Sequence, residues 1–253
     1  MQKGLILCCH GTRSNQGIQD TVKLLRFFKK RYKDYTVKIG YLEITKPTIE
    51  NQLEFFFKKK FDNLLVVPAM IFSGNHVTKD IPKIINNAKK KFKKLPKINF
   101  IPPIIKSKKF FNVVQNNSIK NLLKLRNKTK TGLVVVASNT INTYAKTQIN
   151  LLAKKISKKN KFNFYRTLLV TLNKDNIKKE LKKLVLNYEF IILPIFLFRG
   201  YLLENLKLVV KQINKKENNK FILCSHLKDY KEIYNIISSL ILSDCHDFSP
   251  IRF

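Results

Sequence analysis

The first third of the chain contains three side chains that can ligate a metal ion, at a regular interval. His10, Glu43 and His76 follow one another at spacings of 33 residues. Two imidazoles and one carboxylate form a ligand set that divalent transition metals accept, and three protein ligands leave further coordination positions open. Imidazole can also accept a proton near neutral pH. The residue types therefore predict a divalent metal site at which proton transfer can occur.

A histidine by itself is more often a structural residue of a loop or core than a ligand, so the prediction depends on the joint placement. Each of the three residues comes at or shortly after the end of an apolar segment that is typical of a strand, at 4–9, 36–42 and 63–70. Neighbouring strands lie about 4.8 Å apart, and open parallel sheets bind ligands at the carboxyl ends of their strands. We therefore expect the three side chains to meet at one point. Gly74 fits this expectation, because a loop that turns sharply around a ligand favours a residue without Cβ.

Short apolar runs alternate with longer amphipathic segments throughout the chain, which is typical of α/β folds with a parallel sheet. The expected strands of the first half are 4–9, 36–42, 63–70 and 98–101, with helices near 17–32, 47–60, 77–93 and 108–125. The same series then begins again, with strands at 131–137, 163–170, 189–197 and 220–224, and helices near 141–157, 174–187, 201–216 and 230–242.

Two direct alignments indicate an internal duplication. Residues 4–7 match 132–135, and residues 68–74 match 194–200, at offsets of 128 and 126 residues. The sequence therefore predicts an α/β protein of two similar domains, each a parallel sheet of about four strands flanked by helices.

The polar, charged segment 126–130 has the composition of a linker. We place the N-terminal domain at residues 1–128 and the C-terminal repeat at residues 129–253. The second copy lacks both histidines, because His10 aligns with Ser138 and His76 with Leu202. If folding required the histidines, both copies would be expected to keep them. This difference predicts one metal site per chain, in the first domain.

Three motifs of the first domain resemble those of the class II chelatases, specifically the long sirohydrochlorin cobaltochelatases and ferrochelatases. They are CHGTRS at 9–14, YLEITKP at 41–47 and PAMIFSGNHVTKDIP at 68–82. The likeness is strong over the first hundred residues and faint in the second half. It implies a pair of chelatase-like α/β domains and the ATP-independent insertion of a divalent metal into a tetrapyrrole, in cobalamin or sirohaem biosynthesis.

The same resemblance assigns roles to the three candidate ligands. The two histidines of the family fall on His10 and His76, and a glutamate that related chelatases use falls on Glu43. The imidazoles would hold the metal above the macrocycle, and either would accept a pyrrole proton. Glu43 would ligate the metal, orient a histidine or relay a proton, and the sequence leaves these three roles open.

The implied substrates are a polycarboxylate tetrapyrrole, sirohydrochlorin, and a divalent metal. Co²⁺ and Fe²⁺ are the expected ions, a His/His/Glu set also accepts Ni²⁺, and no organic cofactor is implied. Arg13, Lys46 and Lys79 lie beside the motifs and are candidate partners for the substrate carboxylates. Their alternative reading is that of exposed charges in a lysine-rich chain.

The net charge of +34, from 50 basic and 16 acidic residues, normally points to nucleic acid or an anionic surface. Here the excess is mostly lysine and is spread along the chain, whereas nucleic-acid readers favour arginine for bidentate contacts. The composition therefore favours solvated faces over a nucleic-acid footprint. A charge of this sign would still attract a polyanionic small substrate.

Other functions remain as alternatives. A histidine-phosphatase-like enzyme is suggested by the His-Gly-Thr sequence at 10–12, but that chemistry needs an arginine where Cys9 stands, and it gives His76 and Glu43 no role. A basic nucleic-acid-binding protein with incidental histidines is the alternative from another class. A chelatase-like protein that binds metal or tetrapyrrole without turnover is a third.

The longest apolar stretch, 190–203, contains Pro194, Arg199 and Gly200 and falls short of the roughly 20 residues that span a bilayer. The apolar run 4–9 is too short for a signal peptide core. The four cysteines do not suggest a disulfide framework. We expect a cytoplasmic protein with no membrane partner, and the sequence leaves its oligomeric state open.

Overall fold

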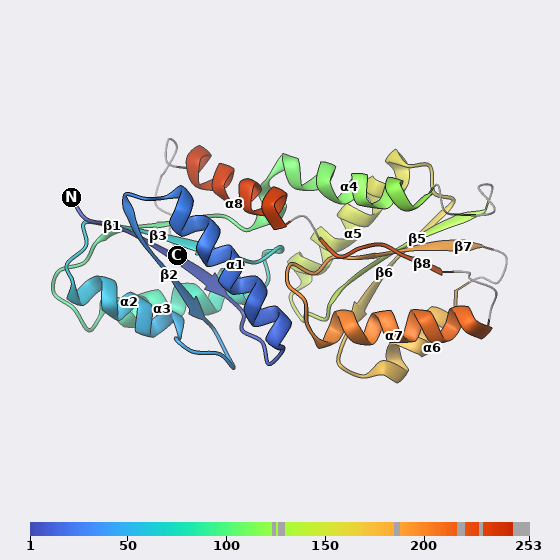
Figure 1. Cartoon of the computed structure of the whole chain (residues 1–253), viewed down its shortest axis with the longest axis horizontal. Coiled ribbons are helices and arrows are strands. Elements are labelled where there is room, and N and C mark those ends of the chain that lie inside the picture. The colour runs from blue at the N-terminus through green and yellow to red at the C-terminus, as the bar shows by residue number, and fades with distance from the viewer. Residues whose placement is uncertain (123–124, 126–129, 185–187, 217–220, 228–229, 245–253) are drawn as a thin grey trace. The chain divides into compact units, whose positions relative to one another are not determined.

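The computed structural model describes residues 1–122, 125, 130–184, 188–216, 221–227 and 230–244. The chain forms two compact units (Figure 1). Unit 1 consists of Met1–Ser107 together with Tyr230–Phe253, and unit 2 consists of Lys108–Asp229.

Unit 1 is built on a four-stranded parallel sheet with the strand order β2-β1-β3-β4. Its strands are β1 Lys3–Cys9, β2 Tyr35–Tyr41, β3 Asn63–Pro68 and β4 Lys97–Phe100. Its α-helices are α1 Asn15–Arg31, α2 Ile49–Lys58, α3 Ile81–Lys89 and α8 Tyr230–Asp244, with a π-helical turn η1 at His76–Asp80 and a 3₁₀ turn η2 at Ile104–Lys106.

Unit 2 repeats this plan with a second four-stranded parallel sheet of order β6-β5-β7-β8. Its strands are β5 Thr131–Ser138, β6 Phe164–Val170, β7 Glu189–Pro194 and β8 Phe221–Leu223, and its helices are α4 Lys108–Leu122, α5 Thr143–Lys159, α6 Lys174–Lys182 and α7 Tyr201–Lys216. The equivalent strand order in both sheets confirms the predicted α/β class and the predicted repetition.

The two central strands share a packing constraint at their first glycine. A Cβ atom on Gly4 would lie 2.7 Å from the ring of Phe56, and one on Gly132 would lie 2.4 Å from the ring of Phe190. Both phenylalanines are fully buried. In each unit an aromatic ring therefore packs directly on the backbone of the central strand, which explains why both copies of the repeat keep a glycine there.

The compact units depart from the predicted division at 1–128 and 129–253 in the placement of one helix from each repeat. Helix α4 belongs to unit 2, and helix α8 belongs to unit 1. The residues at the predicted boundary, 126–129, lie outside the described part of the chain. The division into two repeats stays our proposal for the sequence, and each compact unit contains the last helix of the other repeat.

Helix α8 is bound to α1 by polar and aromatic contacts. The Nε of Arg31 donates to Oγ of Ser238 at 2.7 Å, and the hydroxyl of Tyr234 donates to the carbonyl oxygen of Asp20 at 3.3 Å. The Tyr234 ring also lies 5.3 Å from that of Phe27. An amphipathic pattern shows that a helix has an apolar face but does not specify which sheet that face covers, so the sequence could not place α8.

Of the helices in the described residues, none combines the length and hydropathy that crossing a bilayer requires.

Candidate metal-binding site

The two predicted histidines lie together at the carboxyl edge of the first sheet. Strand β1 ends at Cys9, so His10 is the first residue beyond it, and His76 begins the turn η1 after β3. Their ring centroids are 4.6 Å apart, with an interplanar angle of 82°. Two side chains separated by 66 residues in the sequence therefore form an edge-to-face pair of imidazoles.

The sheet register accounts for this approach. Strands β1 and β3 are neighbours, Cys8 is paired with Pro68, and the N–H of Ala69 donates to the carbonyl oxygen of Cys8 at 2.8 Å. The chain then turns back at Gly74, whose carbonyl oxygen accepts the N–H groups of the two residues after His76 at 3.0 Å. The turn delivers His76 toward the end of β1.

Asp80 holds the ring of His76. Its Oδ2 lies 2.7 Å from Nδ1 of His76, four residues earlier on the same turn. A carboxylate on Nδ1 keeps the proton on that nitrogen and leaves the lone pair of Nε2 available to a metal ion. Sequence reasoning missed Asp80 as a site residue, although a histidine and an acid four residues apart in a helical segment are the signal for such a pair.

The second repeat supports this pairing. At the offset of 126 residues that aligns His76 with Leu202, Asp80 aligns with Leu206. Leu206 is fully buried in the core of unit 2. The histidine and its acid are therefore both replaced by leucine in the copy that lacks the site.

We expect Asp80→Ala to weaken Co²⁺ binding by about 10- to 100-fold, because His76 loses the group that fixes its orientation and tautomer. Asp80→Asn should lose less, since the amide oxygen can still accept the Nδ1 proton. Isothermal titration of the metal-free protein with Co²⁺ measures both effects. An unchanged affinity in Asp80→Ala would show that the contact is incidental.

The backbone of Glu43 is bound to that of His10. The N–H of Glu43 donates to the carbonyl oxygen of His10 at 3.0 Å. Its carboxylate is near enough to raise the pKa of His10. Within the described residues, however, no three or more His, Cys, Asp or Glu side chains are grouped so that they could hold a metal ion. Glu43 is exposed, and its part in holding the metal ion stays a prediction. The order of the strands brings the loops together, but it does not fix the direction of a side chain on a loop.

The pKa of His10 is lowered from its ordinary value of 6.5. Loss of solvent contact is the largest cause, and the neighbouring His76 adds to it, while the charge of Glu43 and a backbone hydrogen bond act in the opposite direction. A lowered pKa means that His10 stays neutral to a more acidic pH than a free histidine. Its lone pair is therefore available to a metal ion at neutral pH.

The environment of His10 predicts the outcome of an NMR titration of its ring protons. The midpoint should lie below 6.5 in the metal-free protein. It should fall further in Glu43→Gln, which removes a negative charge, and rise in His76→Ala, which removes the electrostatic effect of His76 and part of the desolvation. A midpoint at or above the ordinary value in the wild type, or shifts of opposite sign, would contradict this description.

Cys9 directly precedes His10 but cannot join it as a ligand. Both Cys8 and Cys9 are completely buried, and burial raises the pKa of each thiol well above its ordinary value. Fully buried structural cysteines of this kind are inert toward ions and substrates in solution. The ligating chemistry at this strand end is therefore that of imidazole.

The role expected of Gly74 around a ligand stays a prediction, and the structure adds a second glycine to the site. A Cβ atom on Gly74 would meet nothing within 4 Å, whereas one on Gly11 would lie 1.9 Å from the carbonyl oxygen of Glu43. Gly11 also has a φ of 104°, a backbone conformation that side chains disfavour. The glycine that the site requires is therefore Gly11, which follows His10.

The three basic candidates, Arg13, Lys46 and Lys79, are all exposed and follow β1, β2 and β3 respectively. None of them forms an ion pair with another described residue. Their placement around the same sheet edge suits the binding of an anionic substrate, and that role stays a prediction.

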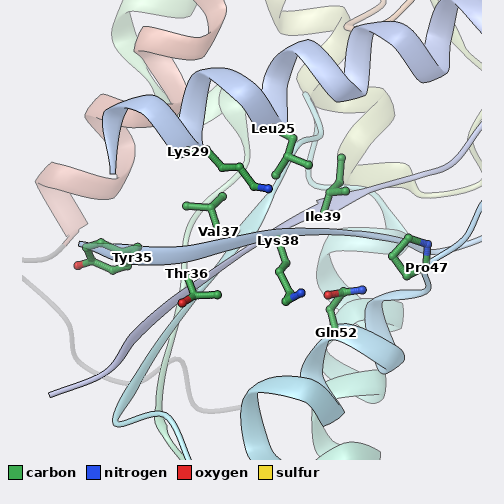
Figure 2. A pocket seen from close by; sticks show the side chains of 9 residues that line it. All are labelled: Leu25, Lys29, Tyr35, Thr36, Val37, Lys38, Ile39, Pro47 and Gln52. Carbon is green, nitrogen blue, oxygen red and sulfur yellow. The ribbon is translucent and has the colours of Figure 1, made fainter. Parts of the chain in front are cut away.

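A cavity of about 540 Å³ lies elsewhere in unit 1, along the outer edge of β2 (Figure 2). Helices α1 and α2 flank it, and its lining consists of Leu25, Lys29, Tyr35, Thr36, Val37, Lys38, Ile39, Pro47 and Gln52. None of the candidate ligands lines this cavity. The two histidines lie instead at the carboxyl edge of the sheet.

Comparison with known proteins identifies the family. The sequence pattern of the CbiX family matches residues 4–120 and matches again at residues 132–243. The chain belongs to the CbiX family. The double match agrees with the internal duplication, and the resemblance to class II chelatases is confirmed.

Several relatives of this CbiX chain have described activities. It is 22% identical over 255 residues to the sirohydrochlorin ferrochelatase of Priestia megaterium, across 98% of this chain and 94% of that protein. It is 30% identical over 82 residues to the sirohydrochlorin cobaltochelatase of Methanococcoides burtonii (strain DSM 6242 / NBRC 107633 / OCM 468 / ACE-M), across 32% of this chain and 63% of that protein.

The fold of the CbiX chain is that of a solved chelatase. It matches the crystal structure of the sirohydrochlorin chelatase SirB from Bacillus subtilis subspecies spizizenii in complex with cobalt, with a TM-score of 0.76 at 19% identity. The match covers 97% of this chain and 96% of that protein. At this identity the comparison establishes the shared fold.

Proposed function

We propose that this protein is a sirohydrochlorin chelatase that inserts Co²⁺ or Fe²⁺ into the tetrapyrrole without ATP, in cobalamin or sirohaem biosynthesis. The observation that carries the proposal is the pair of imidazoles, His10 and His76, 4.6 Å apart at the carboxyl edge of a CbiX-type sheet. The ferrochelatase and cobaltochelatase activities of its relatives support the same substrate and both metals.

The reaction exchanges two pyrrole protons for one metal ion. The neutral rings of His10 and His76 bind the hydrated cation and displace part of its water. As the ion passes to the four ring nitrogens, the imidazoles lose their ligand and become free to accept the two protons, which then pass to solvent. No electron is transferred, so the step needs neither a redox group nor an organic cofactor.

The geometry favours one of the three roles of Glu43 that the sequence left open. Its carboxylate raises the pKa of His10, and no three-ligand cluster includes it among the described residues. A negative charge next to His10 stabilises the imidazolium that forms when a pyrrole proton is accepted. Glu43 therefore acts as the partner of a proton-accepting His10 rather than as a third metal ligand.

The substrate carboxylates are bound by exposed cations at the same edge, for which Arg13, Lys46 and Lys79 are the candidates. The net charge of +34 increases the rate at which a polycarboxylate reaches the protein. A cytoplasmic location fits the three buried free cysteines of the described residues, since reduced thiols are typical of that compartment.

The test is to mix purified protein with sirohydrochlorin and with Co²⁺, Fe²⁺ or Ni²⁺ in turn under anaerobic conditions. The absorption spectrum of the macrocycle reports insertion. We expect insertion of Co²⁺ or Fe²⁺ to be faster than in a protein-free control. Rates equal to the protein-free control for every metal would overturn the proposal.

A further inference from the structure

A single hydroxyl group connects the two loops that carry His10 and Glu43. The Oγ1 of Thr45 accepts the backbone N–H of Thr12 at 3.0 Å and donates to the backbone carbonyl oxygen of Thr12 at 3.0 Å. Thr12 lies two residues after His10, and Thr45 lies two residues after Glu43. Both backbone groups of one residue are thus bound by one side chain of the neighbouring loop.

Together with this contact, two backbone hydrogen bonds join the same two loops. The N–H of Leu42 donates to the carbonyl oxygen of Cys9 at 2.9 Å, and the N–H of Glu43 donates to that of His10 at 3.0 Å. Gly11 allows the carbonyl oxygen of Glu43 to approach its Cα, where any Cβ would collide. The backbone bonds extend the pairing of β1 and β2 by two residues, and Thr45 closes the loops beyond that point.

The segment held in this way is strained. Ile44, between Glu43 and Thr45, has a φ of 65°, which is unusual for a β-branched residue, and its side chain is 59% exposed. Burial of the side chain therefore does not compensate for the conformation. Strained backbone of this kind persists where the surrounding structure fixes it, and it gathers at functional sites.

We propose that Thr45 is a positioning residue for metal insertion, fixing the carboxylate of Glu43 relative to the imidazole of His10. The inference rests on the proposed chelatase function. The hydroxyl of Thr45 both accepts from and donates to the backbone of Thr12. We therefore assign it no contact with the metal or the tetrapyrrole, and it acts by holding the backbone on which Glu43 is carried.

The second repeat shows that the fold does not need this contact. Cys8 is paired with Gly40, and Val136 with Leu168, so both strands of the second pair lie 128 residues after those of the first. Residues 42–48 connect β2 to α2, whereas only residues 171–173 connect β6 to α6, so the second repeat has no counterpart of Thr45. Asn173 caps helix α6, as Thr48 caps helix α2. The repeat that lacks the histidines keeps the helix cap without the loop that carries Thr45.

The first test compares Thr45→Val with Thr45→Ser. Valine keeps the shape and branching but removes the hydroxyl, leaving the Thr12 N–H without that partner. We expect the insertion rate at saturating substrate to fall about tenfold, the effect of one lost hydrogen-bonding group. KM for sirohydrochlorin should stay within about twofold, because the proposal gives Thr45 no contact with the substrate. Serine retains the hydroxyl and should restore the rate.

Thr171→Val is the matched control. Thr171 follows β6 in the second repeat, and its hydroxyl accepts the N–H of Asn173 at 3.4 Å within one loop. This variant should insert metal at the wild-type rate. The thermal unfolding midpoint of each variant shows whether it is folded. If Thr45→Val does not fold, Thr45→Ser still tests the proposal, because it must insert metal at the wild-type rate.

A double-mutant cycle with Glu43→Ala decides whether Thr45 acts through Glu43. If it does, Thr45→Val should reduce the rate much less when Glu43 is already absent. Fully additive effects, or a wild-type rate in Thr45→Val, would overturn this inference while leaving the chelatase function intact. A wild-type protein that inserts no metal would instead overturn the function itself.

Discussion

His10→Ala is expected to lower the rate of metal insertion by about 10²- to 10⁴-fold, and His76→Ala by a comparable factor. Each variant removes one of two imidazoles that lie 4.6 Å apart, and a single imidazole neither holds the cation firmly nor accepts both protons. The measurement is the initial rate of the absorption change of sirohydrochlorin with Co²⁺, at metal concentrations that saturate the wild type.

The double variant His10→Ala, His76→Ala should be little slower than either single variant, because residues that act as one unit are not additive. His226→Ala is the matched control. His226 belongs to unit 2, after β8, and the proposal gives it no role, so its loss should leave the rate unchanged. Comparable insertion by the wild type and the double variant would exclude the two histidines as the catalytic pair.

Gly11→Ala is expected to lower the free energy of unfolding of unit 1 by about 3 kcal/mol or more and to remove activity. The new Cβ would stand 1.9 Å from the carbonyl oxygen of Glu43, at a φ of 104°. The obstructing atom belongs to the backbone, and the N–H of Glu43 is already bound to His10. Neither loop can move without breaking the contacts that place the site residues.

Gly74→Ala provides the control for this variant on the other side of the site. A Cβ on Gly74 meets nothing within 4 Å, so this substitution should change the unfolding midpoint by little. Urea titration followed by circular dichroism measures both variants. Equal stabilities of Gly11→Ala and Gly74→Ala would contradict the close approach of the Gly11 and Glu43 loops.

Much of the fold could be predicted because both repeats have strong periodic patterns. The strand expected at 98–101 lies at Lys97–Phe100, and the helix expected near 47–60 is Ile49–Lys58. The helix expected near 77–93 is divided into the π-helical turn His76–Asp80 and α3. Apolar periodicity follows the buried face, which continues through both segments, and therefore does not reveal the change in winding.

The part of the candidate site that could be predicted is the part that the strand ends position. His10 and His76 meet because β1 and β3 are adjacent and parallel. The apolar runs indicate the strands, and their alternation with helices indicates a parallel sheet, but the order of the strands comes from the structure. The direction of the Glu43 side chain and the bond from Asp80 to His76 depend on local loop and helix geometry. The Thr45 contact depends on a bond between loops 33 residues apart, for which the sequence has no periodic signal.

Helix α4 belongs to unit 2 and helix α8 to unit 1, and this arrangement determines the order in which the two units can be completed during synthesis. Unit 2 is continuous from Lys108 to Asp229, so all of it has been synthesised before α8 exists. The segment with both histidines is translated before unit 2, yet it lacks the buried side chains of Ile233, Ile236 and Ile237 until α8 follows. Nascent chains would therefore complete the unit that carries the site only after all of unit 2 has been made and has had time to fold.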